Sequence, residues 1–418
     1  MTEMGDTKFL LGASTAAHQV EGNNIHSDFW VQENLKHSTF VEKSLDAVDH
    51  YRRYEEDIKM LRDAGLNAYR FSVEWARIEP SEGKFDPKEL DHYRDVINCC
   101  YENGVTPVIT LLHFSSPAWL IGKGGWGTEK VVEYFRRYVD YVTSNLKVDL
   151  PYICTINEAN MGYQVSKVAR EFTKRRKSGD VQVGINIDIK KIILGMFEQG
   201  FAFHCNPFKV KTFLSPRKQE EEVFVMKAHQ AAKEVIKKNM PGTKVGLTLS
   251  LYDYQPVEGG EKYAEQLWYE DFGFYLPYIE NDDFIGVQNY SRKLVAKVDT
   301  LTPAAGAPVT QMGYEDYPQG IGHVVKKVSE QFKGEILVTE NGIATSDDAR
   351  RCEFIREAVQ GIKDSGVPIK GYFHWSLLDN FEWQTGFSMT FGLCAVDRAN
   401  GMKRMPKESL KVLGEQTF

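Results

Sequence analysis

The chain has 418 residues, of which 42% are hydrophobic and 26% are charged. That is enough apolar material for a large core, either in one large barrel or in two ordinary domains. Because the formal net charge is −7, nothing attracts the chain generally to nucleic acid or to an anionic membrane surface.

Targeting, membrane and metal-binding signals are not evident in the sequence. The stretch MTEMGDTKFLLGAS does not have the basic and apolar regions of a secretion signal, and no apolar run approaches the length of a membrane span. The six cysteines are scattered without a C-x-x-C pair, which favours buried free thiols over a zinc site. No phosphate-binding glycine loop or dinucleotide fingerprint occurs. We therefore expect a soluble, cytoplasmic protein that needs no metal or cofactor.

Short apolar runs recur along the chain and predict eight strands. Most runs are continuous rather than alternating, which is typical of parallel strands covered on both faces. In chain order the predicted strands are residues 9–14, 68–73, 106–114, 152–158, 244–251, 283–290, 335–340 and 369–378.

Segments with helical spacing of apolar residues lie between these runs. Tyr51, Tyr54, Ile58 and Leu61 keep a three/four spacing, and the segment 132–146 keeps the same spacing. Each of these helices would pack one face on the sheet. Further helices are predicted at residues 88–103, 221–239, 261–275, 321–332 and 347–365.

Strands that alternate with helices in this way predict an α/β fold, a (β/α)₈ TIM barrel, which usually has roughly 250 residues and often more with insertions. The additional residues should lie in long loops after strands, at 15–48, 159–220 and 291–320. No linker or low-complexity tract divides the chain, so residues 1–418 are expected to form a single domain. A doubly wound sheet with a second lobe is the alternative.

The predicted strands end in an unusual set of polar and aromatic residues. In such barrels the reactive side chains gather at the carboxyl ends of the strands. Glu158 closes the fourth strand and Glu340 the seventh, so a barrel could bring the two carboxylates face to face. The other residues at or just after strand ends are Arg70, His113, Asn157, Gln288, Tyr290, Trp375, Glu382 and Trp383.

Two facing carboxyl groups suit glycoside hydrolysis. One must be protonated to release the leaving oxygen, and the other must be ionised to attack or to activate water; a separation of about 5–5.5 Å gives retention and a longer one inversion. Aromatic rings at the same ends suit the C–H faces of sugars. Trp119 and Trp126 join this aromatic set, although packing in the core or in a loop is the alternative for each tryptophan.

Six motifs in chain order give the sequence a resemblance to glycoside hydrolase family 1, the β-glucosidase family, over nearly the whole chain. They are GASTAAHQVEG, YRFSVEWARIEP, TLLHF, TINE, VTENG and HWSLLDNFEW. The resemblance implies that Glu340 is the nucleophile and Glu158 the acid/base. It also implies that Arg70 and Tyr290 neighbour the nucleophile and lower its pKa. The positions that it assigns to sugar binding are Gln19, His113, Asn157, Gln288, Tyr290, Trp375, Glu382 and Trp383.

A few positions depart from the common pattern of the family that the chain resembles. Ala159-Asn160 follows the acid/base position, where proline is frequent, and Gln288 occupies an asparagine position. The chain is short for the family, which suggests trimmed loops and a more open entrance. The segment 387–393 carries no cation, which favours an unphosphorylated sugar, and the presence of Glu158 favours an O-glycosidase over a thioglucosidase.

The resemblance implies a retaining, exo-acting β-glycosidase, in the first place a β-glucosidase with possible β-galactosidase or β-fucosidase activity. Its ligand would be a small-molecule β-glycoside or a short oligosaccharide, and no nucleic acid, membrane, metal or cofactor would take part. An endo-acting β-glycanase of a related barrel and a non-catalytic sugar-binding barrel are the alternatives. The sequence leaves the oligomeric state open.

Overall fold

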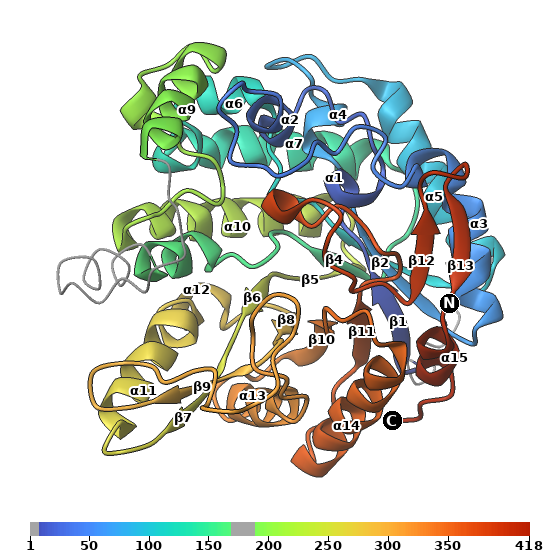
Figure 1. Cartoon of the computed structure of the whole chain (residues 1–418). Coiled ribbons are helices and arrows are strands. Elements are labelled where there is room, and N and C mark those ends of the chain that lie inside the picture. The colour runs from blue at the N-terminus through green and yellow to red at the C-terminus, as the bar shows by residue number, and fades with distance from the viewer. Residues whose placement is uncertain (1–7, 169–188) are drawn as a thin grey trace.

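The computed structural model describes residues 8–168 and 189–418, in which helices surround a central set of strands (Figure 1). Every predicted strand position contains a strand, although most strands are shorter than predicted. The strands of the central sheet are β1 (Leu10–Ser14), β2 (Ala68–Ser72), β3 (Thr106–Thr110), β4 (Tyr152–Cys154), β5 (Lys244–Gly246), β6 (Thr248–Ser250), β8 (Phe284–Gln288), β10 (Glu335–Asn341) and β11 (Gly371–Trp375).

The central sheet is parallel and closes into a barrel. Its strand order is β5-β4-β3-β2-β1-β11-β10-β8-β6. Only Leu247 separates β5 from β6, and β5 pairs with β4 whereas β6 pairs with β8. These two short strands are therefore the halves of one barrel strand that bridges both edges of the sheet. The fold is the predicted (β/α)₈ barrel, and the doubly wound alternative is wrong.

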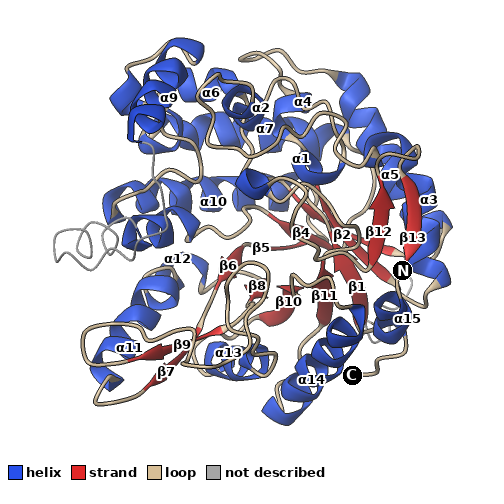
Figure 2. Ribbon diagram, in the orientation of Figure 1, coloured by secondary structure: helices blue, strands red, loops and turns tan. Residues whose placement is uncertain are grey.

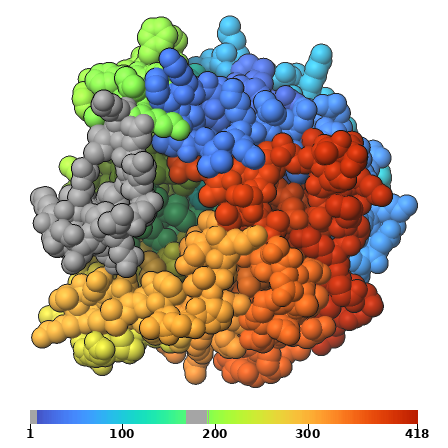
Figure 3. Space-filling view, viewed as in Figure 1, coloured from blue at the N-terminus to red at the C-terminus, as the bar shows by residue number. Residues whose placement is uncertain are grey.

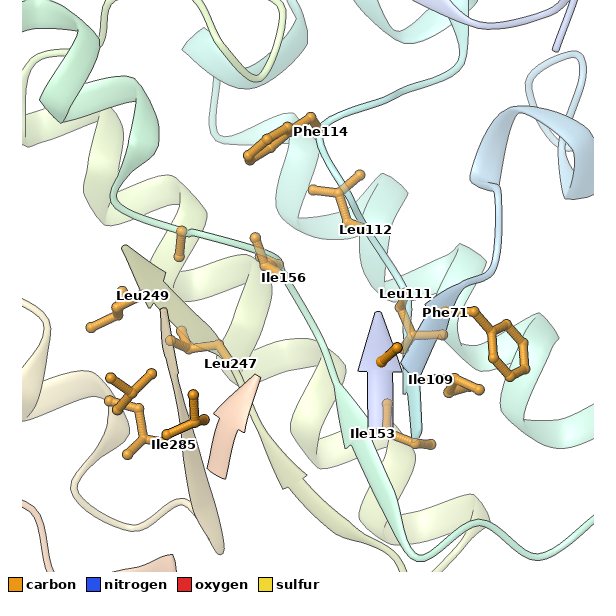
Figure 4. Packing of buried hydrophobic residues seen from close by; sticks show 14 of the residues in the cluster. Phe71, Ile109, Leu111, Leu112, Phe114, Ile153, Ile156, Leu247, Leu249 and Ile285 are labelled. Atoms are coloured by element: carbon orange, nitrogen blue, oxygen red, sulfur yellow. The ribbon is translucent and has the colours of Figure 1, made fainter. Parts of the chain in front are cut away.

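Alternate residues of the barrel strands build two separate hydrophobic cores. Residues next to one another in the chain fall on opposite sides: Ile109 and Ile285 pack between the barrel and the helices (Figure 4), whereas Val108 and Phe284 pack inside the barrel. The inner cluster consists of Leu10, Ala68, Val108, Tyr152, Cys154, Phe284, Leu337 and Phe373. Arg70, Gln288 and Trp375 follow inward-facing residues by two or four positions, so the same alternation points them into the barrel.

Helices occupy the outside of the barrel (Figure 2), and every predicted helix position contains one. The helix predicted at 261–275 ends early because a π-helical turn, η3 (Tyr269–Gly273), follows it. The predicted helices are α3 (His50–Asp63), α5 (Pro87–Glu102), α7 (Lys130–Asn145), α10 (Gln219–Asn239), α11 (Glu261–Trp268), α13 (Gly320–Ser329) and α14 (Asp348–Ser365).

Capping residues in the sequence set the ends of several helices. Asp86 caps α5 by accepting the N–H of Lys88, and Pro87 occupies the first helical position, where an N–H has no partner to lose. Asp347 caps α14 in the same way by accepting two backbone N–H groups. Gly366 ends α14 at a φ of 70°, a left-handed conformation that glycine adopts without strain.

The segments predicted as long loops contain regular elements. Most of these are short, and few residues define each one, but α9 (Ile189–Ala202) is a helix of 14 residues that the prediction of a loop at 159–220 missed. Part of the segment 159–220 lies outside the described residues. Two further strand pairs lie apart from the barrel sheet: β7 (Asp253–Pro256) pairs with β9 (Arg292–Val295), and β12 (Cys394–Asp397) pairs with β13 (Lys403–Pro406). The remaining elements are α1 (Ala17–Val20), α2 (Asp28–Glu33), α4 (Trp75–Ile78), α6 (Ala118–Gly122), η1 (Gly125–Gly127), η2 (Pro207–Lys209), α12 (Leu276–Ile279), η4 (Trp383–Thr385) and α15 (Glu408–Gly414).

Two predictions from composition can be compared with this fold. All six cysteines are free thiols, five of them buried and Cys205 partly exposed, as their scattered spacing predicts. Among the helices that the structure describes, none is both long enough and apolar enough to cross a membrane.

Candidate active site

A cavity of about 360 Å³ lies where the carboxyl ends of the barrel strands meet. Figure 3 shows this face hollowed near its centre, between the segments coloured orange and red. Several predicted site residues lie behind the cavity wall instead of lining it, namely Gln19, Arg70, Asn157 and Gln288. The predicted site residues that line it are His113, Glu158, Tyr290, Glu340, Trp375, Glu382 and Trp383.

Irregular backbone after two strands carries part of this lining. The sequence predicted strands as far as residues 114 and 158, but β3 ends at Thr110 and β4 at Cys154. Phe114 has a φ of 67° and Glu158 a φ of 40°, which side-chain-bearing residues seldom adopt. These left-handed residues lie four positions beyond the ends of β3 and β4, so His113 and Glu158 lie on irregular backbone after the strands. Strained backbone of this kind is concentrated at functional sites.

The carboxylate of Glu340 is held from two sides. Nη1 of Arg70 donates to Oε1 of Glu340 at 2.6 Å, and the hydroxyl of Tyr290 donates to Oε2 at 2.7 Å. The side chain of Arg70 has no exposed surface and that of Glu340 has 5%. Because both oxygens receive a donor, the plane and direction of this carboxylate are fixed toward the cavity.

Behind the cavity, the side-chain oxygen of Asn157 collects three donors. Nη2 of Arg70 donates to it at 2.6 Å, Nε2 of Gln288 at 2.8 Å and the hydroxyl of Thr248 at 3.1 Å. With its oxygen occupied, Asn157 turns its nitrogen toward Nε2 of His113 at 3.1 Å. Gln288 therefore supports Asn157 from behind and does not line the cavity, and its side chain also hydrogen-bonds to Glu340.

At the other side of the cavity, Gln19 holds Glu382. Nε2 of Gln19 donates to Oε2 of Glu382 at 3.0 Å, and Glu382 lines the cavity beside Trp375 and Trp383. Oε1 of Gln19 and Nδ1 of His113 are buried without a partner among the described residues. Because His113 lines the cavity, a bound polar ligand would satisfy its Nδ1, and a buried polar atom is costly to leave unpaired.

Burial and neighbouring charges give the carboxyl groups of the cavity different tendencies to hold a proton. Burial, and then the charge of Glu340, raise the pKa of Glu158 well above its ordinary value. Burial also raises the pKa of Glu340, but Arg70 and Tyr290 oppose the shift. We expected a net lowering at Glu340; both neighbours do lower its pKa, and burial outweighs them. The order remains that Glu340 loses its proton first and Glu158 keeps its own.

Two further ionisable groups at the cavity wall are shifted toward their neutral forms. Burial, followed by the charge of Glu340, raises the pKa of Glu382 to about 8. Burial and the nearby guanidinium of Arg70 lower the pKa of His113 well below its ordinary value. His113 is therefore a neutral imidazole at pH 7, and Arg70 is the cation that faces Glu340.

The electrostatic contact between the two carboxyl groups gives a testable prediction. Replacing Glu340 with glutamine removes the charge that raises the pKa of Glu158, so that pKa should fall while remaining above its ordinary value because burial persists. Titration of the carboxyl groups by infrared difference spectroscopy measures the shift. Glu382→Gln is the matched control and should move the same pKa less, because Glu382 contributes least of the groups that raise it. An unchanged pKa in Glu340→Gln would contradict the contact.

Some residues that the sequence singled out lie elsewhere. Trp119 donates to the backbone oxygen of Glu79, and Trp126 is fully buried and donates to Ser116, so neither lines the cavity. Trp119 lies in α6 and Trp126 in η1, two short helices after β3, where their own hydrogen bonds hold them. For these two tryptophans the packing alternative is correct.

Other residues of the site escaped the sequence reasoning. Thr248 and Ser250 are alternate polar positions in the run KVGLTLSL, and this period of two was an available signal for inward-facing hydroxyls. Met312 and Tyr314 line the cavity from the segment 291–320, which has no periodic pattern. No group of three or more histidine, cysteine or acidic side chains is arranged to hold a metal ion within residues 8–168 and 189–418.

Comparisons with known proteins agree with this architecture. Among curated proteins, β-glucosidase A of Thermotoga maritima is 30% identical over 438 residues, which cover 96% of this chain and 95% of that protein. A 1,4-β-D-glucan glucohydrolase of Thermotoga neapolitana is 30% identical over 461 residues, with coverage of 96% and 95%.

Solved structures give the same result. The crystal structure of β-glycosidase BGL167 has a TM-score of 0.88 at 38% identity and covers 98% of this chain and 96% of its own. The Thermotoga maritima β-glucosidase in complex with glucoimidazole has a TM-score of 0.77 at 26% identity, with coverage of 97% of each chain. A sequence model described as glycosyl hydrolase family 1 matches residues 2–181 and 278–416. The chain thus belongs to glycosyl hydrolase family 1 and is a β-glucosidase-type glycoside hydrolase.

Proposed function

We propose that this enzyme is a retaining, exo-acting β-glucosidase with β-galactosidase or β-fucosidase as side activities. It would release the terminal sugar from aryl or alkyl β-glycosides or from short oligosaccharides. The observation that carries the proposal is that Glu158 and Glu340 line one cavity in different electrostatic settings, with Arg70 touching only Glu340 of the two. The relatives' names, β-glucosidase and 1,4-β-D-glucan glucohydrolase, support glucose as the sugar.

The proposed reaction has two displacements at the anomeric carbon. Glu340 attacks as the carboxylate while Glu158 gives its proton to the leaving oxygen, and an ester forms between the sugar and Glu340. The ester has no charge, so the group that raised the pKa of Glu158 is gone and Glu158 can stay ionised. It then takes a proton from water as the water oxygen attacks the same carbon, and Glu340 leaves as the carboxylate.

Packing around Trp383 supports action at the end of a sugar chain. Its ring lies parallel to that of His18, with centroids 5.9 Å apart, and contacts Phe29 and Phe114. Beside it, the hydrogen bond from Gln19 fixes Glu382. This wall would block a chain that continued past the first sugar, whereas an endo-acting enzyme needs an open cleft.

Hydrolysis of a panel of nitrophenyl β-glycosides tests the proposal. We expect turnover fastest on the glucoside, and early proton NMR spectra should show the β-anomer as the first product. An α-anomer formed first would contradict retention. Loss of viscosity from a long β-glucan without monosaccharide release would indicate endo action, and tight sugar binding without any turnover would indicate a binding protein.

The hydroxyl of Tyr290 gives a smaller prediction about the nucleophile. Tyr290→Phe removes the bond to Oε2 of Glu340, and because a hydrogen bond to a charged group contributes about 1.5–3 kcal/mol, kcat should fall about tenfold to a hundredfold. Tyr275→Phe is the matched control, because Tyr275 donates to the buried carboxylate of Glu222 at 3.1 Å and does not line the cavity. Equal losses of kcat in both variants would contradict the role of Tyr290.

We also propose that residues 1–418 act as one catalytic domain in the cytoplasm. Two observations support this. β1 and β11, from the two ends of the chain, are neighbours in one sheet, and six free cysteines suit a reducing compartment.

A further inference from the structure

The backbone of Glu158 needs an external partner. Its φ of 40° is left-handed and not that of a strand residue. The residues before and after it, Asn157 and Ala159, form backbone hydrogen bonds to two different segments. The N–H of Asn157 donates to the carbonyl of Leu112 at 2.8 Å, and the N–H of Ala159 donates to the carbonyl of Thr248 at 3.0 Å. The N–H of Glu158 donates instead to a side chain, the hydroxyl oxygen of Thr248, at 2.8 Å.

The hydroxyl of Thr248 is fully occupied. It accepts from the N–H of Glu158 and from Nε2 of Gln288 at 3.0 Å, and it donates to the side-chain oxygen of Asn157 at 3.1 Å. One donor and two acceptors are all that a hydroxyl offers. The residue has no exposed surface and its backbone N–H donates to the carbonyl of Ile156 at 3.1 Å. Thr248 therefore holds the segment that carries Glu158 through both backbone and side chain.

The same contacts continue to the other carboxylate. Asn157, which receives the hydroxyl of Thr248, also receives Nη2 of Arg70 at 2.6 Å, and Nη1 of Arg70 contacts Glu340 at 2.6 Å. A continuous set of hydrogen bonds thus joins the backbone of Glu158 to the side chain of Glu340. Thr248 lies between the two stretches that the family's sequence model matches, and it does not line the cavity.

We propose that Thr248 is a positioning residue, whose hydroxyl fixes the carboxyl group of Glu158 relative to Glu340. This inference rests on the proposed roles of Glu158 as acid/base and Glu340 as nucleophile. Thr248 touches no substrate. It acts by accepting the N–H of Glu158, which fixes this left-handed backbone residue, so the direction of the Glu158 side chain depends on it. Misplacement of a catalytic group by about 1 Å is enough to slow a reaction by about a hundredfold.

Thr248→Val tests the proposal, because valine has nearly the same shape but no hydroxyl. A misplaced acid matters most when the leaving group is poor. We expect kcat/KM for an alkyl β-glucoside to fall about tenfold to a hundredfold, whereas kcat/KM for dinitrophenyl β-glucoside should stay within about threefold of the wild type. Thr248→Ser, which restores the hydroxyl, should recover most of the loss.

A purely structural role would give a different result. It would reduce the amount of active enzyme and lower kcat/KM by one common factor for every leaving group, and that result would overturn the proposal. Thr155→Val is the matched control: Thr155 follows β4 and contacts Nδ1 of His229 at 2.7 Å, away from the cavity. Its dependence on the leaving group should equal that of the wild type, and a dependence as steep as in Thr248→Val would also overturn the proposal.

A second variant keeps the test decisive if Thr248→Val does not fold. Gln288→Met removes one partner of Thr248, together with the bonds of Gln288 to Asn157 and Glu340, and should steepen the dependence on the leaving group to a smaller extent; no steepening would overturn the proposal. Failure of the proposed function is distinguishable, because then the wild type would turn over no glycoside in the series. The proposal specifically expects Thr248→Val to lose more kcat/KM on the alkyl β-glucoside than on the dinitrophenyl β-glucoside, while the wild type hydrolyses both.

Discussion

Replacing Glu340 with alanine is expected to abolish turnover of nitrophenyl β-glucoside, with kcat lower by about four to six orders of magnitude. The variant has no group that can attack the anomeric carbon from the side of Arg70, so the glycosyl–enzyme ester cannot form. Steady-state kinetics at high enzyme concentration measure the residual rate. Circular dichroism checks the fold, because Arg70 loses its buried partner at 2.6 Å.

The stereochemistry of chemical rescue makes this test specific to the nucleophile. Azide entering the space left by Glu340 would attack the anomeric carbon directly, and a single displacement inverts the configuration, so the product should be the α-azide. Glu335→Ala is the matched control, because Glu335 begins the same strand β10, pairs with Lys244 at 2.6 Å and does not line the cavity. It should keep near-normal kcat. A Glu340→Ala enzyme with more than a few per cent of wild-type kcat would refute the assignment.

The strands could be predicted because their apolar runs are continuous, and Glu340 could be placed because β10 continues as a strand as far as Asn341, although its register with β8 and β11 shifts after Val338. Two irregularities could not be predicted. β4 ends at Cys154, four residues before the left-handed Glu158, and the fifth barrel strand breaks at Leu247, where its halves pair with different neighbours. Both depend on contacts between strands that are distant in the sequence.

The candidate site, like the fold, could be predicted only in part. Motifs indicate which residue types meet at the strand ends, but they do not distinguish Trp383, which lines the cavity, from Trp126, which is buried in η1. The net shift at Glu340 was also out of reach, because it balances burial against Arg70 and burial is a property of the whole fold. Thr248 belongs to no motif; its alternation with Ser250 indicates an inward-facing hydroxyl, but only its three hydrogen bonds show what that hydroxyl holds.

Removal of Glu340 and removal of Glu158 should affect different sets of substrates. Glu340 forms and breaks the covalent bond, so every substrate needs it. Glu158 supplies a proton in the first displacement and removes one in the second, and the first of these tasks is dispensable when the leaving group is stable as an anion. We therefore expect kcat/KM to fall for every substrate when Glu340 is replaced, but mainly for substrates with poor leaving groups when Glu158 is replaced.

Glu158→Ala should lower kcat/KM for an alkyl β-glucoside by about two to four orders of magnitude, the usual contribution of a general acid, and that for dinitrophenyl β-glucoside by less than about tenfold. Without a base for the second displacement, the glycosyl–enzyme should accumulate and kcat should fall even on the good substrate. Azide needs no base, so it should restore kcat. Two successive inversions then yield the β-azide, and an α-azide would contradict both assignments.

The pH profile distinguishes Glu158 from its neighbour Glu382. In the wild type, kcat/KM for the alkyl glucoside should fall as pH rises through the raised pKa of Glu158, because the acid is lost on deprotonation. Glu158→Ala has no such proton to lose, so its profile should be flat on that side. If kcat/KM of the variant still falls near pH 8, the group that loses its proton would instead be Glu382. Glu382 lines the same cavity, and burial raises its pKa to about 8. The alkaline limb therefore identifies the proton donor only if it disappears with Glu158.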